Sequence, residues 1–512
     1  MSKMKITPLD MIEWEVLRSP TKMIVQESTI ELPAGLNAVL VDRTDSYGLT
    51  AVLQGVVNPL EVRAWETRAN ALLPGDAGHR FSITAICESG AKAALNNVLL
   101  TGQRTLRGDG LMHAPLHVPE ISFMAPDFIH IENEISWFTD WYLNGPEHKL
   151  LFCRSTTREV TETFKRERTL PDNMGGNEVW WLTTGAGDDD TLPGPLSSVG
   201  KDFFVVSPIT GSKFLVTRAA VDNGPTWSIN LGFEYRPEWG GIPSGDDRTA
   251  IGEIVGFVLG RHLLQVGTSV FSNEGLPIHE KALPAWGPDV QATCRSLDYS
   301  PINAEGRYMV GPQLEQILSQ LVPKYLEVRD QFELQSALWT YWIARRMPLG
   351  TSIPLIATAL ETIRHAWNAS ALSKRNGVYM QKAEFETLLQ EELNSAKSKV
   401  SEVPYGKSIT NKLYASYQMS VAQQTESFFA EIGLPVDKGE AYVMWFRNQL
   451  THSSVSTDAD WELINSITHG YFSLFHRVVL KLLDYDGPYV DRSVFGWPHK
   501  PLHEPIGIRS KA

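Results

Sequence analysis

Residues 438–452 read KGEAYVMWFRNQLTH, and this stretch decides how we interpret the C-terminal part of the chain. Its middle is strongly apolar, as in a helix that packs into a core, and the apolar run ends at Arg447 and Asn448. His452 follows five positions after Arg447. A guanidinium that keeps its charge is thus placed near an imidazole that titrates close to neutrality. We therefore expect a helix that carries a candidate catalytic site.

The sequence on both sides of this stretch repeats apolar residues at helical spacing. The clearest helix is predicted over residues 355–367, with Glu361 and His365 on the face opposite the apolar stripe. Further helices are predicted over residues 385–400 and 409–432, and a long final helix begins near Trp461. These segments predict an all-α helical bundle.

The N-terminal part has a different pattern. Residues 227–235 alternate apolar and polar side chains, and residues 203–206 and 213–216 flank a turn-forming segment, which predicts a hairpin. One helix is predicted within this part, over residues 248–258. We expect an α+β multidomain protein, in which a β-rich region resembling a sandwich or barrel precedes the helical bundle.

Length and composition set the domain organisation. A chain of 512 residues is too long for one hydrophobic core. We predict a β-rich region over residues 1–310, formed by one or two subdomains, a helical domain over 311–486, and an extended, proline-rich tail over 487–512.

Cysteine content and hydropathy narrow the class of protein further. The three cysteines are far apart and form no CxxC motif, so we expect neither a disulfide framework nor a zinc site, and no metal or cofactor. The chain has no signal-like apolar segment at its N-terminus and no apolar run of about 18 residues. These features predict a cytoplasmic protein without a membrane segment.

The net charge of −13 is distributed unevenly. Residues 311–512 contain 20 Lys and Arg against 21 Asp and Glu, so almost all of the negative charge lies in residues 1–310. An acidic surface repels nucleic acid. If the protein binds RNA, we expect the C-terminal part to do so.

The residue types at the candidate site suit cleavage of RNA. A neutral His452 can take the proton of a ribose 2′-OH, or a protonated one can donate to the leaving 5′-oxygen. Arg447 would stabilise the charge of the transition state, and Asn448 would orient the imidazole or the phosphate. The products would be a 2′,3′-cyclic phosphate and a 5′-hydroxyl, without a divalent ion.

The geometry of a regular helix complicates this hypothesis. Asn448 and His452 share a face, whereas Arg447 points about 140° away from His452. Arg447 and His452 can converge if the helix frays or turns near residues 450–452, or if two copies of the motif meet in a symmetric dimer, and we expect both. In the competing interpretation, Arg447 pairs with a carboxylate and His452 caps the C-terminus of the helix.

The Arg-Asn-x-x-x-His motif within a C-terminal helical domain resembles the signature of HEPN ribonucleases. The order of a long β-rich region and then this domain resembles the ApeA-type HEPN proteins of bacterial anti-phage defence. The resemblance implies a metal-independent endoribonuclease that acts as a homodimer on host or phage RNA and responds to a phage-derived trigger, as abortive-infection toxins do. It assigns catalytic roles to Arg447, Asn448 and His452. Glu361 is interpreted mainly as a solvated carboxylate, with a place at the site as the alternative.

Two other motifs resemble functional sites, and one other function fits the domain order. Arg107 and His113 have similar spacing but lie in a turn-like β region, and we set them aside. The sequence Gly406-Lys407-Ser408 resembles a phosphate-binding loop but lacks the required glycine at Ser401, so we expect it to cap a helix. The alternative function is a non-catalytic binding or signalling protein whose β-rich region recognises a protein or a carbohydrate.

Overall fold

The computed structural model describes residues 20–508, except 63–64, 66–79, 89, 102–104, 107–109, 125–134, 147–150, 155–159, 170–176, 186–197, 202, 219–227, 273–276, 287–288, 296–298, 304–310, 435 and 453–460. The chain forms two compact units. The first comprises residues 1–298 and 307–320, and the second comprises residues 299–306 and 321–512. Among the described helices, none combines the length and the apolar character needed to cross a membrane.

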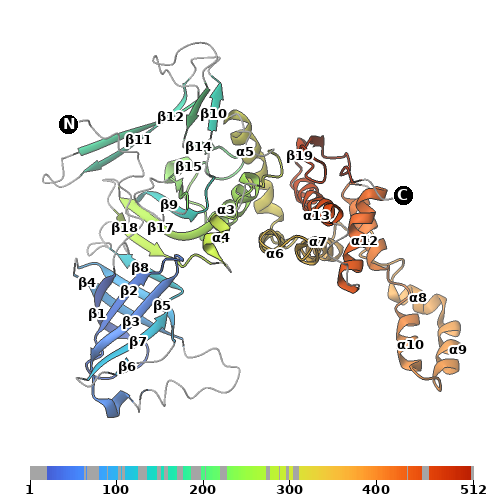
Figure 1. Cartoon of the computed structure of the whole chain (residues 1–512), viewed down its shortest axis with the longest axis horizontal. Helices are drawn as coiled ribbons and strands as arrows, with labels where there is room; N and C mark the ends of the chain where they lie inside the picture. The colour runs from blue at the N-terminus through green and yellow to red at the C-terminus, as the bar shows by residue number, and fades with distance from the viewer. Residues whose placement is uncertain are drawn as a thin grey trace. The chain divides into compact units, whose positions relative to one another are not determined.

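The first unit contains a closed barrel of six antiparallel strands (Figure 1). Around the ring the strands follow the order β1 (Thr21–Ser28), β2 (Ala38–Arg43), β3 (Leu49–Val56), β7 (Leu111–His117), β5 (Lys92–Leu100) and β4 (Phe81–Cys87). Pairing of β4 with β1 closes the ring. The short strand β6 (Thr105–Leu106) pairs with β7.

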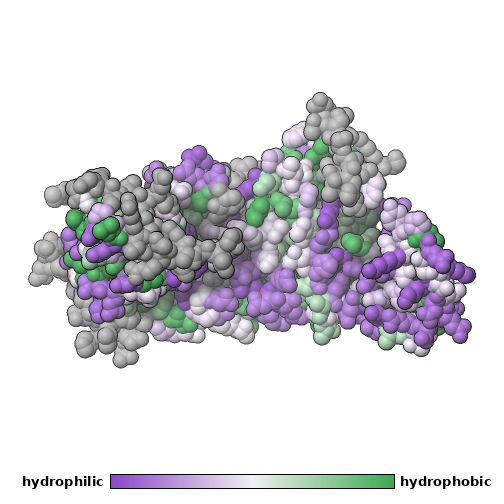
Figure 2. Space-filling view, turned by 90° about the horizontal axis from the view of Figure 1, so that it is seen from below, coloured by the Kyte–Doolittle hydropathy of each residue, from purple (hydrophilic) through white to green (hydrophobic). Residues whose placement is uncertain are grey.

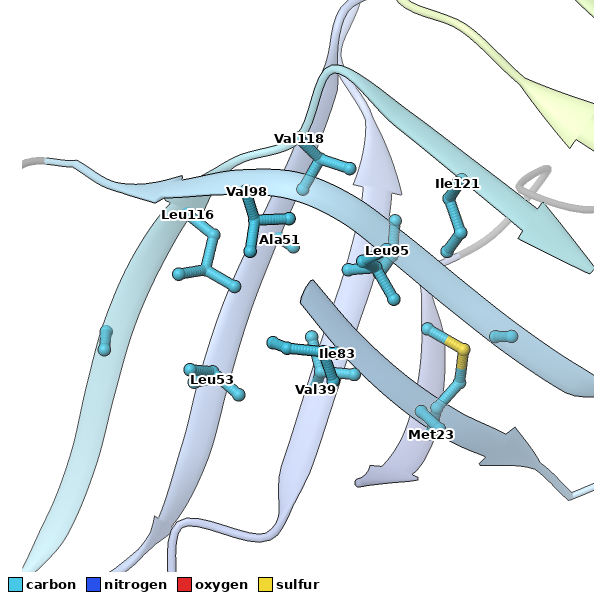
Figure 3. Close-up of a cluster of buried hydrophobic side chains, with 14 of the residues drawn as sticks. Met23, Val39, Ala51, Leu53, Ile83, Leu95, Val98, Leu116, Val118 and Ile121 are labelled. Atoms are coloured by element: carbon cyan, nitrogen blue, oxygen red, sulfur yellow. The ribbon is translucent and has the colours of Figure 1, made fainter. Parts of the chain in front are cut away.

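The interior of the barrel is a packed apolar core (Figure 3). Alternate residues of each strand point inward, as Met112, Ala114 and Leu116 do on β7. Side chains from the six strands meet at the centre, among them Val39, Leu53, Ile83 and Leu95, which are 0% exposed. Because side chains fill it, the barrel is a core and not a channel.

Strand β5 also pairs with β8 (Glu120–Met124), and this pairing extends the sheet beyond the barrel. The extension continues through β18 (Pro277–Ala282), β17 (Leu264–Ser272), β9 (Ile135–Leu143), β16 (Leu231–Tyr235), β15 (Phe214–Arg218) and β14 (Phe203–Val206). Two separate two-stranded sheets pair β10 (Leu151–Arg154) with β13 (Ser198–Lys201), and β11 (Val160–Thr169) with β12 (Asn177–Gly185). The described part of the unit also contains a 3-10 helix (Pro237–Trp239) and helix α4 (Val290–Cys294).

Helix α3 (Gly245–Leu259) packs on the extended sheet through a close contact and a buried ion pair. A Cβ atom on Gly252 would lie 2.6 Å from the Tyr142 hydroxyl oxygen, so only glycine allows the helix to approach this closely. The fully buried Asp140 accepts a 2.7 Å hydrogen bond from Arg248 Nε and a 2.6 Å bond from the Thr268 hydroxyl. These contacts fix α3 against β9 and β17.

The second unit is helical. Its helices are α5 (Gly311–Val328), which begins in the first unit, α6 (Leu334–Ala344), α7 (Ser352–Ala369), α8 (Lys382–Leu388), α9 (Gln390–Val400), α10 (Gly406–Tyr414), α11 (Val421–Glu431), α12 (Lys438–His452) and α13 (Trp461–Leu482). Helix α13 is central, because residues on all of its sides are buried from Gly470 to Leu480. Helices α6, α11 and α12 each pack against α7.

Helices α8, α9 and α10 form an insertion between α7 and α11 (Figure 1). Its two ends are joined by backbone hydrogen bonds, from Tyr379 N to the Tyr417 carbonyl at 2.9 Å and from Met419 N to the Gly377 carbonyl at 3.1 Å. Helix α10 begins at Gly406, with Tyr405 as its N-cap, and no side chain caps it. The expected capping role of Gly406-Lys407-Ser408 is therefore wrong.

The C-terminal segment differs from the extended tail predicted over residues 487–512. Strands β19 (Pro488–Val490) and β20 (His499–Pro501) form a hairpin, and Tyr489 and Val490 are fully buried. The segment folds against the helical unit because apolar side chains, among them Tyr489 and Val490, lie between its prolines and become buried.

A buried ion pair holds this segment to the helices. Arg477 of α13 pairs with Glu440 of α12, and both side chains are 0% exposed. The same guanidinium donates to the Leu502 carbonyl at 3.1 and 3.2 Å, and Glu440 accepts a bond from Ile506 N at 3.3 Å. Helices α12 and α13 and the C-terminal segment thus share one charged centre.

The structure confirms the expected α+β organisation, a β-rich part with a barrel followed by a helical part. The hairpin predicted over 203–216 is β14–β15, and the helix predicted over 248–258 is α3. The segments 385–400 and 409–432, each predicted as one helix, are each divided into two.

Candidate functional site

Four helices of the second unit enclose a cleft of about 500 Å³. Helix α7 contributes Leu360, Glu361 and Arg364, and α12 contributes Met444, Trp445 and Arg447. Helix α11 supplies Val421, Ala422, Thr425, Glu426, Phe428 and Phe429, and α13 supplies Tyr471; Ala357 and Ala441 complete the lining. The volume is in the range typical of small-molecule sites. The lining is mostly apolar, with charged groups at Glu361, Arg364, Glu426 and Arg447.

Local sequence explains how α12 presents Arg447 to this cleft. Asp437 accepts a 2.7 Å hydrogen bond from Glu440 N, which stabilises the first turn of the helix. Val443 and Phe446, three positions apart, are buried and fix the rotation of the helix. Arg447 follows Phe446 directly and is therefore held at the edge of the buried face, with its side chain 30% exposed.

Arg447 forms an ion pair with Glu361 of α7, whose side chain is 28% exposed. The solvated carboxylate expected at Glu361 is thus incorrect, and the alternative, that Glu361 reaches the site, holds. The pairing also agrees with the competing interpretation, in which a carboxylate neutralises Arg447.

Arg364 adds a second positive charge to the cleft. It lies one turn after Glu361 on α7, is 2% exposed, and donates to Gln424 Oε1 at 3.1 Å and to the Val421 carbonyl at 3.3 Å. Burial lowers the pKa of Arg364, the Glu361 carboxylate raises it, and the Arg447 charge lowers it. Arg364, Arg447 and Glu361 together carry one net positive charge, which suits an anionic ligand at this point, while Glu426 makes the lining as a whole neutral.

Asn448 and His452 were predicted to be catalytic, but their side chains lie outside the part of the chain that the structure describes. The backbone of α12 continues as a helix to His452, so the helix end expected near residues 450–452 does not occur before the histidine. On this unbroken helix, Arg447 and His452 lie about 140° apart around the axis. Of the motif set aside earlier, Arg107 lies outside the described residues and His113 lies in barrel strand β7.

Sequence reasoning missed two aromatic residues of the cleft. Trp445 is 50% exposed although it lies in the apolar run, and its indole is available for stacking. Tyr471 donates a 3.0 Å hydrogen bond to the Met444 carbonyl and thereby ties α13 to α12. Burial raises the pKa of Tyr471, so its hydroxyl remains a donor.

A second polar cluster lies between α6 and α13 of the helical unit. Tyr299 bonds to His469 Nδ1 at 2.5 Å, and Tyr341 bonds to His476 Nε2 at 2.9 Å. The guanidiniums of Arg345 and Arg492 lie 3.6 and 4.0 Å from the ring centroid of Tyr299. Burial, and then the charges of Arg345 and Arg492, lower the pKa of His469 to about 4. The cluster is positively charged, and His469 is neutral at neutral pH.

Among the described residues, no three His, Cys, Asp or Glu side chains gather as a metal site would require. Comparison with protein-family models, curated proteins and solved structures found no match to this chain.

Proposed function

We propose that the chain is a metal-independent endoribonuclease of the HEPN type that acts in anti-phage defence. The observation that carries this proposal is the position of Arg447, partly exposed in a cleft that Arg364 and the half-exposed Trp445 also line. A guanidinium and an exposed indole in one cleft suit a phosphate and a base.

The proposed reaction is an attack of the ribose 2′-oxygen on the adjacent phosphorus atom. Neutral His452 takes the 2′-OH proton, the new P–O bond forms, and the bond to the 5′-oxygen breaks as that oxygen receives a proton. Arg447 stabilises the charge on the non-bridging oxygens, and Asn448 orients the imidazole or the phosphate. The products are a 2′,3′-cyclic phosphate and a 5′-hydroxyl.

The unbroken helix α12 supports a homodimeric site. Arg447 and His452 of one helix diverge by about 140°, so one copy does not direct both groups at the same phosphate. In a symmetric dimer, Arg447 of one copy and His452 of the other face a shared groove.

The defence role gives each part of the chain a task. The β-rich region, which carries most of the negative charge, responds to a phage-derived trigger and restrains the helical unit until infection. The helical unit then cleaves host or phage RNA in the cytoplasm.

One observation favours a second candidate function, a non-catalytic binding or signalling protein. Arg447 already has a carboxylate partner in Glu361, as a structural ion pair would. In this alternative, the helical unit only dimerises and the β-rich region recognises a protein or carbohydrate.

Expression of wild-type protein and of the Arg447→Ala and His452→Ala variants separates the two functions. The nuclease proposal predicts fragmented RNA and arrested growth with the wild type in the presence of its trigger, and neither with the variants. Glu384→Gln, which removes an exposed charge of α8 outside the cleft, is the matched control and retains activity. Equal RNA integrity for all four proteins, at equal expression and under infection, would favour the binding protein.

A further inference from the structure

The end of the α8–α10 insertion carries an isolated positive charge. Between Glu392 and Glu426 the sequence contains four lysines, Lys397, Lys399, Lys407 and Lys412, and one acidic residue, Glu402. The chain as a whole has a net charge of −13. All four lysines are exposed, and none has an ion-pair partner among the residues that the structure describes.

Three of these lysines lie on the chain close to one backbone contact between α9 and α10. A Cβ atom on Gly406 would lie 1.8 Å from the Val400 carbonyl oxygen, so the start of α10 touches the end of α9. Lys399 and Lys407 are the immediate neighbours of these two contacting residues, and Lys397 lies less than one turn before Lys399. We name residues 397–408 the tip of the insertion.

Four of the five acidic residues of the insertion lie at its other end, and the fifth, Glu402, lies within the tip. Glu384 and Glu386 are on α8, and Glu391 and Glu392 are in the first turn of α9. Along α9, Glu391 and Lys399 are about 12 Å apart at 1.5 Å per residue. This distance exceeds the screening length of about 8 Å at physiological salt, so these carboxylates are largely screened from Lys399, whereas Lys397, about 7.5 Å along the helix from Glu392, is partly within their reach.

An exposed aromatic side chain accompanies the lysines. Tyr405 is 85% exposed and connects α9 to α10 with a φ of 66°, a left-handed conformation that bulky residues rarely adopt. Figure 2 shows that the visible surface of the insertion, at the right of the view, is predominantly hydrophilic. Besides the half-exposed Val403, the tip therefore offers charge together with one aromatic ring.

We propose that the tip binds the phosphate backbone of single-stranded RNA, with a base stacked on Tyr405. Lysines attract phosphates without regard to sequence, and an exposed aromatic ring stacks on any base. This inference rests on the proposed function and deepens it: the insertion joins α7 to α11, two helices that line the cleft, and it guides the RNA strand that the Arg447 site cuts.

The test measures binding separately from cleavage. The probe is a fluorescent single strand of about 20 nucleotides that is 2′-O-methylated throughout, so that it has no attacking hydroxyl. Binding to the full chain is followed by anisotropy between about 50 and 200 mM salt. The tip variant carries Lys397→Gln, Lys399→Gln and Lys407→Gln, and the matched control carries Lys374→Gln, Arg375→Gln and Lys382→Gln, three charges outside the tip.

Loss of three phosphate contacts lowers the slope of log affinity against log salt by about 2, whereas the control variant keeps the wild-type slope. Tyr405→Ala weakens binding roughly fivefold or more at every salt concentration, because stacking does not depend on salt. Equal effects of the tip and control variants would overturn the proposal, as would equal competition by polyglutamate. Cleavage of unmodified RNA is scored separately, so a wild type that binds through the tip but does not cleave would overturn the nuclease proposal alone.

Discussion

The buried pair of Glu440 and Arg477 yields the most quantitative prediction about the helical unit. Both side chains are 0% exposed, and Glu440→Gln leaves the Arg477 charge buried without its carboxylate. Two bonds to the Leu502 carbonyl remain, but they do not neutralise the guanidinium. Breaking a buried pair in this way costs about 3–5 kcal/mol.

This free energy corresponds to a large change in thermal stability. For a unit of this size, about 1 kcal/mol shifts the unfolding midpoint by roughly 2–4 °C, so Glu440→Gln should lower it by roughly 6–20 °C. Arg477→Met alone leaves Glu440 buried and should have a similar effect. The double variant carries no uncompensated charge and should recover at least half of the loss.

Calorimetry of the full chain provides the assay. The control is Lys324→Gln, which removes an ion pair with Glu327 and Asp484, both more than half exposed. It should cost less than about 1 kcal/mol. A shift of less than about 2 °C for Glu440→Gln, or a double variant as unstable as the sum of the single variants, would refute the reasoning.

Three other predictions concern the rest of the structure. Gly252→Ala should destabilise the first unit by about 1–3 kcal/mol, because the new methyl group would clash with Tyr142. Urea unfolding measures this change. An unchanged unfolding midpoint would show that α3 can shift to accommodate the methyl group. In the folded state the pKa of His469 is lowered to about 4, whereas in the unfolded chain it is about 6.5. Between these two pH values the imidazole binds a proton only in the unfolded chain. The free energy of unfolding should therefore fall as the pH drops from about 6.5 towards 4. The unfolding midpoint of His469→Gln should fall less over this range, and parallel curves would contradict the assignment. Glu361→Gln should tighten RNA binding by up to about fivefold, because the carboxylate of Glu361 no longer competes with RNA for Arg447. Glu426→Gln should change the affinity less, because Glu426 is not paired with Arg447. Equal changes in affinity for the two variants, measured by anisotropy, would show that only the net charge of the cleft matters.

Much of the local structure follows from sequence patterns. The helices α7 and α12 and the β14–β15 hairpin were predictable because apolar spacing determines which face of an element is buried. The prediction of an extended tail was wrong because prolines indicate an extended chain locally, whereas the burial of Tyr489 and Val490 depends on packing against distant helices.

The candidate site was only partly predictable for a similar reason. Arg447 was identified from its motif, but its pairing with Glu361 joins residues 86 positions apart, and no local pattern encodes that contact. Closure of the barrel likewise depends on the pairing of β4 with β1 and of β5 with β7, which is a tertiary property. The local spacing of apolar residues therefore predicts the helices and strands, whereas the contacts at the candidate site depend on tertiary packing.

The most direct measurement concerns the ends of the cut RNA. A short RNA is incubated with purified, trigger-activated protein in EDTA, beside the same RNA with a 2′-deoxy sugar at the cleavage position and beside the His452→Ala variant. We predict a 2′,3′-cyclic phosphate and a 5′-hydroxyl from the wild type, and no cut in the deoxy substrate or with His452→Ala. Cleavage of the deoxy position, or equal cleavage by His452→Ala, would contradict the proposed role of Arg447 and His452.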